Sequence, residues 1–168
     1  MELKDHILMT RIDNRLVHGQ VGVTWTMTLG ANVIVVIDEA AAHDVLQQKL
    51  MRTVARSSGA DIRFFTADEF GKGFPNVSEN QRLYLIVHDP LPIVDLLKAG
   101  IPIQSVNVGN MHFAKGKMAL NRKVYVDEAD LEALRIIESF NVSIFIQDVP
   151  GSVSEKLSGL DEVKFVLR

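Results

Sequence analysis

A regular alternation between short apolar runs and longer segments with helical spacing limits the folds open to this chain more than any other pattern. Residues 32–37 and 83–87 are almost continuously apolar, which is typical of parallel strands covered on both faces. Residues 43–57 repeat apolar side chains at the spacing of an amphipathic helix. The alternation predicts a single domain over residues 1–168. Its fold class is α/β: an open, mostly parallel, doubly wound sheet with helices on both faces and a small antiparallel edge.

Turn-forming and capping residues divide the chain into the expected elements. We expect strands at residues 6–12, 32–37, 61–65, 83–87, 104–108, 120–126, 142–146 and 163–167. We expect helices at residues 19–29, 43–57, 128–140 and 152–157. Two further helices are expected, one that begins at its capping residue Thr66 and one that ends at about Ala99, and residues 71–80 are expected to form a loop. The apolar stripe of the second helix is predicted to consist of Val45, Leu46, Leu50, Met51 and Val54.

Composition narrows the classes of function. A length of 168 residues with 47% hydrophobic residues supports one sizeable core. The net charge of −3 favours neither a nucleic-acid-binding face nor a polybasic membrane patch. The absence of cysteine excludes disulfides, thiol nucleophiles and thiolate metal sites. Because no apolar run approaches the ~20 residues of a membrane span and residues 1–6 lack a signal-peptide core, we expect a cytoplasmic protein that is not inserted in a membrane.

A polar loop after the first expected strand concentrates the chemistry. It contains Arg11, Arg15 and His18, and a helix is expected to begin directly after it. A helix N-terminus offers unpaired N–H groups to an anion, arginine forks match phosphate oxygens, and a histidine ring nitrogen can act as a nucleophile. These residues favour a histidine that carries a phosphoryl group. Residue types alone leave the alternative open that His18 is a capping or packing residue.

Two later segments hold further candidate residues. The loop over residues 109–116 contains Asn110 and His112, and it should lie beside the His18 loop if both leave the same edge of the sheet. His88 follows another expected strand, where it is either a site residue or a turn histidine beside a capping Asp89. A polar surface loop remains the alternative for residues 109–116.

Four stretches resemble one known family. Arg-Ile-Asp-Asn-Arg-Leu-Val-His-Gly-Gln-Val over residues 11–21, followed by Trp25, is similar to the active-site signature of the IIB components of the bacterial phosphotransferase system, mannose/fructose/sorbose family. Residues 106–113, 123–127 and 145–150 resemble the same family, so the resemblance extends from about residue 7 to about residue 150. The pattern is closest to members specific for N-acetylgalactosamine or galactosamine. Many members have Asp where this chain has Asn14.

The resemblance implies a phosphocarrier. His18 would accept a phosphoryl group, on Nδ1 according to the family, from the IIA component. It would then pass the group to a sugar that enters through the IIC and IID membrane components. The implied phosphate-binding residues are Arg11, Arg15, Asn14, Gly19 and Gln20, and the implied supporting residues are Asp13, Asn110 and His112. No cofactor or metal is expected. The sequence leaves open whether the sugar is instead mannose, fructose or sorbose, and whether the protein forms a homo-oligomer.

Two other classes of function lack their sequence signals. A nucleotide-binding or other phosphate-ligand-binding module would favour G-x-G-x-x-G after the first strand or a G-x-x-x-x-G-K-[ST] loop, and the chain contains neither. A metal enzyme would favour paired histidines, but the five histidines show no H-x-x-x-H or H-E-x-x-H spacing.

A phosphocarrier that passes its phosphoryl group between proteins favours an exposed histidine on a shallow docking face, because its protein partners bind only briefly.

Overall fold

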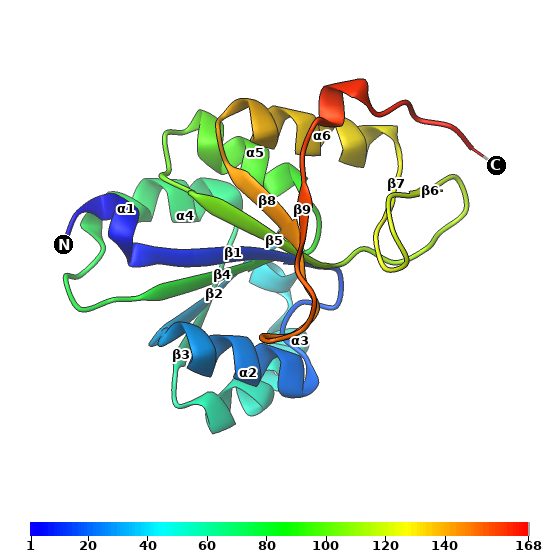
Figure 1. Cartoon of the computed structure of the whole chain (residues 1–168). Helices are drawn as coiled ribbons and strands as arrows, with labels where there is room; N and C mark the ends of the chain where they lie inside the picture. The colour runs from blue at the N-terminus through cyan, green and yellow to red at the C-terminus, as the bar shows by residue number, and fades with distance from the viewer. Residues whose placement is uncertain (168) are drawn as a thin grey trace.

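The computed structural model describes residues 1–167 and contains a seven-stranded sheet with the strand order β3-β2-β4-β1-β5-β8-β9 (Figure 1). The strands of this sheet are β1 (Ile7–Asp13), β2 (Val33–Ile37), β3 (Asp61–Phe65), β4 (Leu83–Val87), β5 (Ser105–Asn110), β8 (Ser143–Ile146) and β9 (Glu155–Leu157). The α-helices are α1 (Leu3–His6), α2 (Gly19–Leu29), α3 (Val45–Ala55), α4 (Ala67–Gly73), α5 (Leu91–Lys98) and α6 (Glu128–Ser139). A separate antiparallel pair consists of β6 (Met118–Ala119) and β7 (Tyr125–Val126).

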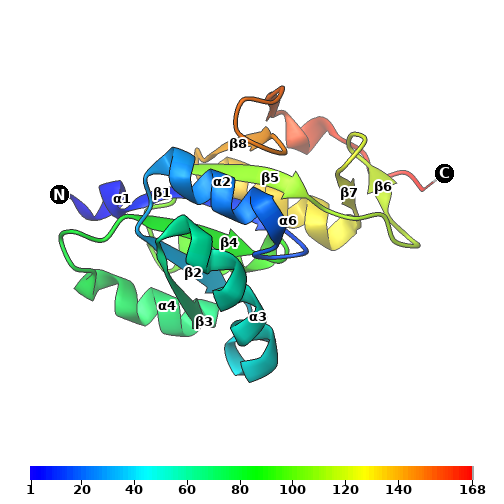
Figure 2. The same cartoon turned by 90° about the horizontal axis from the view of Figure 1, so that it is seen from below.

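The sheet is parallel except at β9, which pairs antiparallel with β8. Helices α2 and α3 cover one face, and α4, α5 and α6 cover the other (Figures 1 and 2). The chain leaves β1 toward β2 on one side and leaves β5 toward β8 on the other. The direction in which the chain leaves the strands therefore reverses between β1 and β5. Open α/β sheets bind ligands at such a switch point. The predicted doubly wound, mostly parallel fold with a small antiparallel edge is confirmed, and the separate β6-β7 pair adds a small antiparallel sheet.

The two central apolar runs form strands because both of their faces are covered. All residues of β2 and β4 are buried. Alternate side chains enter different layers of the core: Ile34 and Val36 pack under α2 and α3, whereas Val33 and Val35 pack against the opposite helices. A strand with this environment needs no polar face, which explains the continuous hydrophobicity of the sequence there.

The chain after residue 150 differs most from the expectation. The sequence pattern predicts a helix over residues 152–157, but Glu155–Leu157 form strand β9, because β8 offers a free edge with which they pair from Ile146↔Glu155 to Ile144↔Leu157. The strand expected over residues 163–167 is absent from the described residues. The backbone carbonyl of Val163 there accepts a hydrogen bond from Arg135 instead of a ladder bond.

Three smaller differences concern short elements. The strand expected over residues 120–126 is divided into β6 and β7, whose pairing leaves residues 120–124 as the connection between them. The loop expected from residue 71 begins later, because α4 continues to Gly73 and a 3-10 turn, Phe74–Asn76, follows it. The short N-terminal helix α1 has no counterpart among the expected elements.

Helix α3 turns a different side to the core than its spacing suggests. Met51 is buried, whereas Val45, Leu46 and Leu50 are exposed. The helix begins at the capping residue Asp44, whose carboxylate accepts a hydrogen bond from the backbone N–H of Gln47. The predicted apolar stripe is therefore wrong at Val45, Leu46 and Leu50 and correct at Met51.

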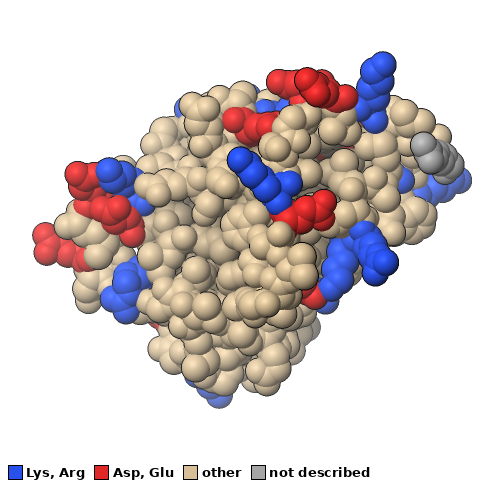
Figure 3. Space-filling model, in the orientation of Figure 1, with Lys and Arg blue, Asp and Glu red and all other residues tan. Residues whose placement is uncertain are grey.

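The surface carries both signs of charge, and in Figure 3 they are scattered over this face of the molecule. Helix α2 contributes none of them, because residues 19–29 contain no charged side chain. No helix within residues 1–167 combines the length and the apolar character that crossing a bilayer requires.

Candidate active site

The polar loop between β1 and α2 lies at the switch point of the sheet. Asp13, at the end of β1, pairs with Asn110, at the end of β5, and the backbone N–H of Asn14 donates to the carbonyl of Asn110 over 3.2 Å. The start of the 109–116 loop therefore lies beside the His18 loop. This confirms the juxtaposition expected from two strands ending at one sheet edge.

His18 is the N-cap residue of α2, and its ring is held by the turn before it. Nδ1 lies 2.9 Å from the backbone carbonyl of Leu16. Because a carbonyl only accepts, Nδ1 carries the proton in this hydrogen bond. In the neutral form of the ring, Nε2 then holds the lone pair, and this atom is buried without a hydrogen-bond partner among residues 1–167. The ring is half-buried, with Nε2 turned away from solvent.

The turn that supplies the Leu16 carbonyl has an unusual backbone. Leu16 has φ 58°, in the left-handed region that non-glycine residues rarely adopt. Its side chain is buried in the core cluster under α2, together with Val17 and Trp25. Burial of the side chain holds the backbone in this strained conformation, which is a common feature of functional sites.

The first turn of α2 provides donors for an anion. The side chain of His18 makes no capping hydrogen bond, so the N–H groups of the first turn keep their hydrogen-bonding capacity. Gly19 has φ 47°, and both Gly19 and Gln20 are exposed. The helix dipole adds a partial positive charge of roughly half a unit at this end. An anion beside His18 would meet backbone donors and a favourable field.

Arg15 is held in place by Asp13. The Asp13 carboxylate accepts hydrogen bonds from the backbone N–H of Arg15 at 3.0 Å, from its Nε at 3.2 Å and from its Nη2 at 3.4 Å. The Arg15 side chain is 39% exposed, and within residues 1–167 its Nη1 makes no hydrogen bond. Arg15 therefore presents an oriented guanidinium group with a free donor at the surface of the loop.

Arg11 lies beneath this surface. Its side chain is only 2% exposed, and its Nη2 donates to Asp13 over 3.1 Å. Its Nη1 donates to Asn107 Oδ1 at 2.5 Å and to the backbone carbonyl of Gln147 at 3.1 Å. The expected direct contact between Arg11 and a phosphoryl group does not fit this placement, because the guanidinium group is buried and occupied by protein acceptors.

The other predicted residues lie at or just after the carboxyl ends of β1, β4 and β5. Asn14 Oδ1 is buried without a partner among residues 1–167. Asn110 is buried, and its Nδ2 contacts Nε2 of the exposed His112. His88 is exposed and contacts Asp89, whose carboxylate also accepts the backbone N–H of Leu91. These contacts are those of a turn histidine beside an Asp cap.

Sequence reasoning missed the residues of β5 and of the loop after β8 that surround Arg11. Asn107 is a fully buried polar residue between the buried Val106 and Val108, and this pattern was the available signal, since buried polar groups need partners. Trp25, which follows the family signature, also belongs to this environment. Its ring centroid lies 5.8 Å from Arg11 Cζ, and its Nε1 donates to the carbonyl of Asp148.

Two ionisable side chains report the electrostatics of this region. A hydrogen bond from Lys123 holds the pKa of Asp148 below its usual range, and the charges of Arg11 and Arg15 act in the same direction. Burial holds the pKa of the Tyr84 hydroxyl far above its usual range, with opposing smaller effects of Arg11 and Asp13. The charges of Arg11 and its neighbours thus act on side chains of β4 and of the loop after β8.

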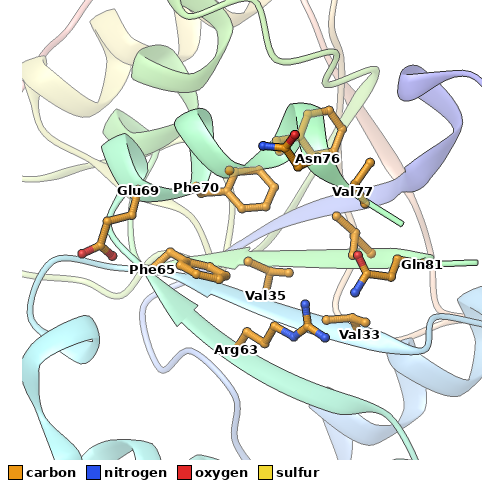
Figure 4. Close-up of a pocket in the computed structure, with 12 residues that line it drawn as sticks. Val33, Val35, Arg63, Phe65, Glu69, Phe70, Asn76, Val77 and Gln81 are labelled. Atoms are coloured by element: carbon orange, nitrogen blue, oxygen red, sulfur yellow. The ribbon is translucent and has the colours of Figure 1, made fainter. Parts of the chain in front are cut away.

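A separate pocket lies away from this loop, between α4 and the strands β2 and β3 (Figure 4). It has a volume of ≈ 140 Å³ and is lined mainly by apolar side chains, among them Phe65, Phe70 and Phe74. No residue of the His18 loop contributes to it. Within residues 1–167, no three His, Asp or Glu side chains are grouped as metal ligands.

The chain matches one protein family over nearly its whole length. The family model described as the PTS system sorbose subfamily IIB component matches residues 7–165. The N-acetylgalactosamine-specific phosphotransferase enzyme IIB component 1 of Escherichia coli K12 is 50% identical over 152 residues, which cover 90% of this chain and 96% of that protein.

Two further similarities extend this finding. The crystal structure of the N-acetylgalactosamine-specific IIB component 1 from Escherichia coli superimposes with a TM-score of 0.87 and 50% identity, and the match covers 90% of this chain and 99% of that one. The mannose-specific EIIAB component of Escherichia coli K12 is 31% identical over 154 residues, which cover 91% of this chain but 47% of that longer protein.

Proposed function

Because the chain belongs to the sorbose subfamily of phosphotransferase-system IIB components, we propose that His18 is the residue that carries the phosphoryl group. The observation that supports this most is the position of His18 at the N-terminus of α2, on the same loop as an Arg15 whose guanidinium group is oriented by Asp13. Phosphoryl transfer depends chiefly on positioning and charge stabilisation, and this arrangement supplies both.

The first transfer takes the phosphoryl group from a phosphohistidine of the IIA component. A lone pair on a His18 ring nitrogen attacks phosphorus, the new N–P bond forms, and the N–P bond of the donor breaks with its electron pair remaining on the donor imidazole. If Nδ1 is the attacking atom, its ring must turn away from Leu16, and the proton that Nδ1 donates there must leave it, with Nε2 becoming the protonated nitrogen.

The second transfer takes the phosphoryl group to a sugar. A sugar hydroxyl attacks phosphorus, the N–P bond at His18 breaks, and the proton released by the hydroxyl balances the proton that the imidazole regains. Arg15 and the first-turn N–H groups of α2, including those of Gly19 and Gln20, hold the phosphoryl oxygens. Asn14, Asn110 and His112 border the loop and complete the site.

The sugar and the partner proteins are inferred from relatives. N-acetylgalactosamine is the substrate that the names of two similar proteins state, at 50% and 37% identity. A mannose-specific relative contains an EIIA part in the same chain, which supports a IIA component as the phosphoryl donor. We place the protein at the cytoplasmic side of the IIC and IID membrane components, to which it delivers the phosphoryl group.

Labelling with a phosphorylated IIA component tests the proposal. We expect wild-type protein to acquire one acid-labile phosphoryl group and His18→Ala to acquire none. His43→Ala is the matched control, because His43 is exposed and is likewise hydrogen-bonded through Nδ1 to a backbone carbonyl, that of Glu39, but follows β2 instead of β1. Equal labelling of His18→Ala and wild type would show that another residue carries phosphorus.

Reconstituted transport tests the sugar. Vesicles containing IIC and IID, supplied with IIA and this protein, should phosphorylate N-acetylgalactosamine faster than galactosamine, mannose, fructose or sorbose. Preferential phosphorylation of one of the latter sugars would overturn the substrate assignment and leave the role of His18 intact.

A further inference from the structure

A continuous row of buried polar side chains leads from strand β5 to the His18 loop. Asn107, on β5, lies opposite Arg11 in the register of the sheet, and its Oδ1 accepts a hydrogen bond from Arg11 Nη1 at 2.5 Å. The Nη2 of Arg11 donates to Asp13 at 3.1 Å, and Asp13 in turn accepts three hydrogen bonds from Arg15. Asn107 is therefore connected to Arg15 through two intermediate side chains.

Along this row, the neutral Asn107 is followed by the positive Arg11, the negative Asp13 and the positive Arg15. The side chains of Arg11 and Asp13 are both almost completely buried, so each requires the other to offset the cost of leaving water. Asn107 is neutral and accepts a hydrogen bond without attracting Arg11 away from Asp13. The Asp13 carboxylate then uses both of its oxygens on Arg15, which fixes the plane of the exposed guanidinium group.

The space around Arg11 is shaped to hold its guanidinium group in one position. Gly109 faces it so closely that a Cβ atom there would lie 2.0 Å from Arg11 Cζ. The ring of Trp25 lies on another side, and the carbonyl of Gln147 accepts bonds from both Arg11 and Asn107. A well-enclosed guanidinium group cannot change its orientation without losing these contacts.

We propose that Asn107 is a positioning residue for phosphoryl transfer, which acts through Arg11 and Asp13 to hold Arg15 beside His18. The inference rests on the proposed function of His18. Asn107 itself does not touch the phosphoryl group. Removing its acceptor leaves Arg11 Nη1 with the Gln147 carbonyl as its single acceptor, which weakens the hold on Arg11. The Asp13 carboxylate is then less firmly fixed, and Arg15 is free to turn away from the position in which it meets the transferring group.

A double-mutant cycle tests this connection. Asn107→Leu removes the acceptor with little change in volume, and Arg15→Gln removes the group that the row positions. Single-turnover transfer from phosphorylated IIA is measured for wild type, both single variants and the double variant, over a range of IIA concentrations. The maximal rate constant and the half-saturating IIA concentration are determined separately, with the folded fraction of each protein measured by circular dichroism.

We expect Asn107→Leu to lower the maximal rate constant about tenfold and to leave the half-saturating concentration unchanged, because the docking surface is untouched. In the Arg15→Gln background, the same substitution should change the rate less than about twofold. A wild-type rate in folded Asn107→Leu would overturn the positioning role. An equal loss in both backgrounds would overturn it too, because the effect would then not pass through Arg15.

A milder variant keeps the test decisive if leucine prevents folding. Asn107→Ser has a hydroxyl too short to reach Arg11, and its transfer rate is measured in the same assay. NMR of the Arg15 Nε–H group gives a readout independent of transfer: its signal should shift and exchange faster in Asn107→Ser, and an unchanged signal would overturn the proposal. Failure of the proposed function looks different, because wild type itself would then remain unlabelled at His18, and both proposals would fall together.

Discussion

At the level of single residues, two arginines of one loop have different environments, because strand register and burial differ between them. Arg11 is within β1, under α2, where nearly every side chain is buried. Arg15 follows the strand end and reaches solvent. Both contact the same carboxylate of Asp13, so the pair of arginines that looks equivalent in the sequence becomes one buried support and one exposed donor.

Gly109→Ala should destabilise the protein, because there is no room for the new side chain. No backbone strain is involved, since Gly109 does not have a positive φ, but the new Cβ atom would overlap the buried Arg11 guanidinium group. We expect the free energy of unfolding to fall by about 1–3 kcal/mol, the usual cost of overpacking. Urea denaturation measures this change.

Gly73→Ala is the control for that substitution. Gly73 has φ −82°, and nothing from the rest of the protein lies within 4 Å of the position that its new Cβ atom would take. Alanine is favoured over glycine in a helix by about 0.5–1 kcal/mol, so this variant should be at least as stable as wild type. Equal destabilisation of both variants would show that the close approach of Gly109 to Arg11 is not the cause.

Asp148 should make the free energy of unfolding depend on pH. Its pKa is lowered in the folded protein by Lys123, so the unfolded chain binds the proton more tightly. The stabilisation that the Asp148 carboxylate contributes is therefore complete above the unfolded-state pKa of this group, and it is lost as the pH falls through the folded-state pKa. Because the carboxylate is 36% exposed, solvent screens the pair, and we expect Asp148→Asn to cost less than about 1 kcal/mol at neutral pH.

Urea midpoints measured between about pH 7 and pH 2 check this dependence. The midpoints of wild type and Asp148→Asn should converge at the acidic end of the range. Lys123→Met should reduce the difference between neutral and acidic pH in the same way, since it removes the other partner. A constant difference between wild type and Asp148→Asn at every pH would contradict the assignment.

At the level of helices and strands, spacing predicted that residues 43–57 are mostly helical but not which side of the helix packs. Helix α3 runs over Val45–Ala55, and its second half packs on the sheet through Met51 and Ala55. Arg52 lies over the ring of Phe64, at 5.1 Å from Arg52 Cζ to the ring centroid. The buried stripe depends on how the helix is rotated against α2 and β3, which the spacing of apolar residues alone does not specify.

Neighbouring residues of α3 should therefore respond very differently to truncation. Leu50 is 62% exposed, and Leu50→Ala should change the free energy of unfolding by no more than about 0.5 kcal/mol. Met51 is 4% exposed, and Met51→Ala should cost about 2–4 kcal/mol, because it leaves a cavity. Chemical denaturation of the two variants distinguishes them, and similar losses would contradict this orientation of the helix.

Across the entire protein, the site is assembled from segments that are far apart in the sequence. The His18 loop follows β1, Asn107 and Asn110 come from β5, and Gln147 follows β8. These strands are neighbours in the sheet order, and their carboxyl ends meet at one edge. The tail joins the same body, because β9 extends the sheet and Leu160 is buried in the core.

Local patterns of amino acids were sufficient to specify the fold class, the central strands and helices, and the position of His18 between a strand and a helix. Those features depend on periodicity, capping and glycine, which act over a few residues. Resemblance of the His18 loop also indicated the family, which the comparisons confirmed.

The separate environments of Arg11 and Arg15, the contribution of Asn107, the strand β9 and the outward face of α3 became visible only in the folded chain. Each of these depends on which strand lies beside which. A polar side chain in β5 meets Arg11 only because β1 is its neighbour, and residues 155–157 become a strand only because β8 leaves an edge free. Such pairing joins residues that are distant in the sequence, and no local pattern specifies it.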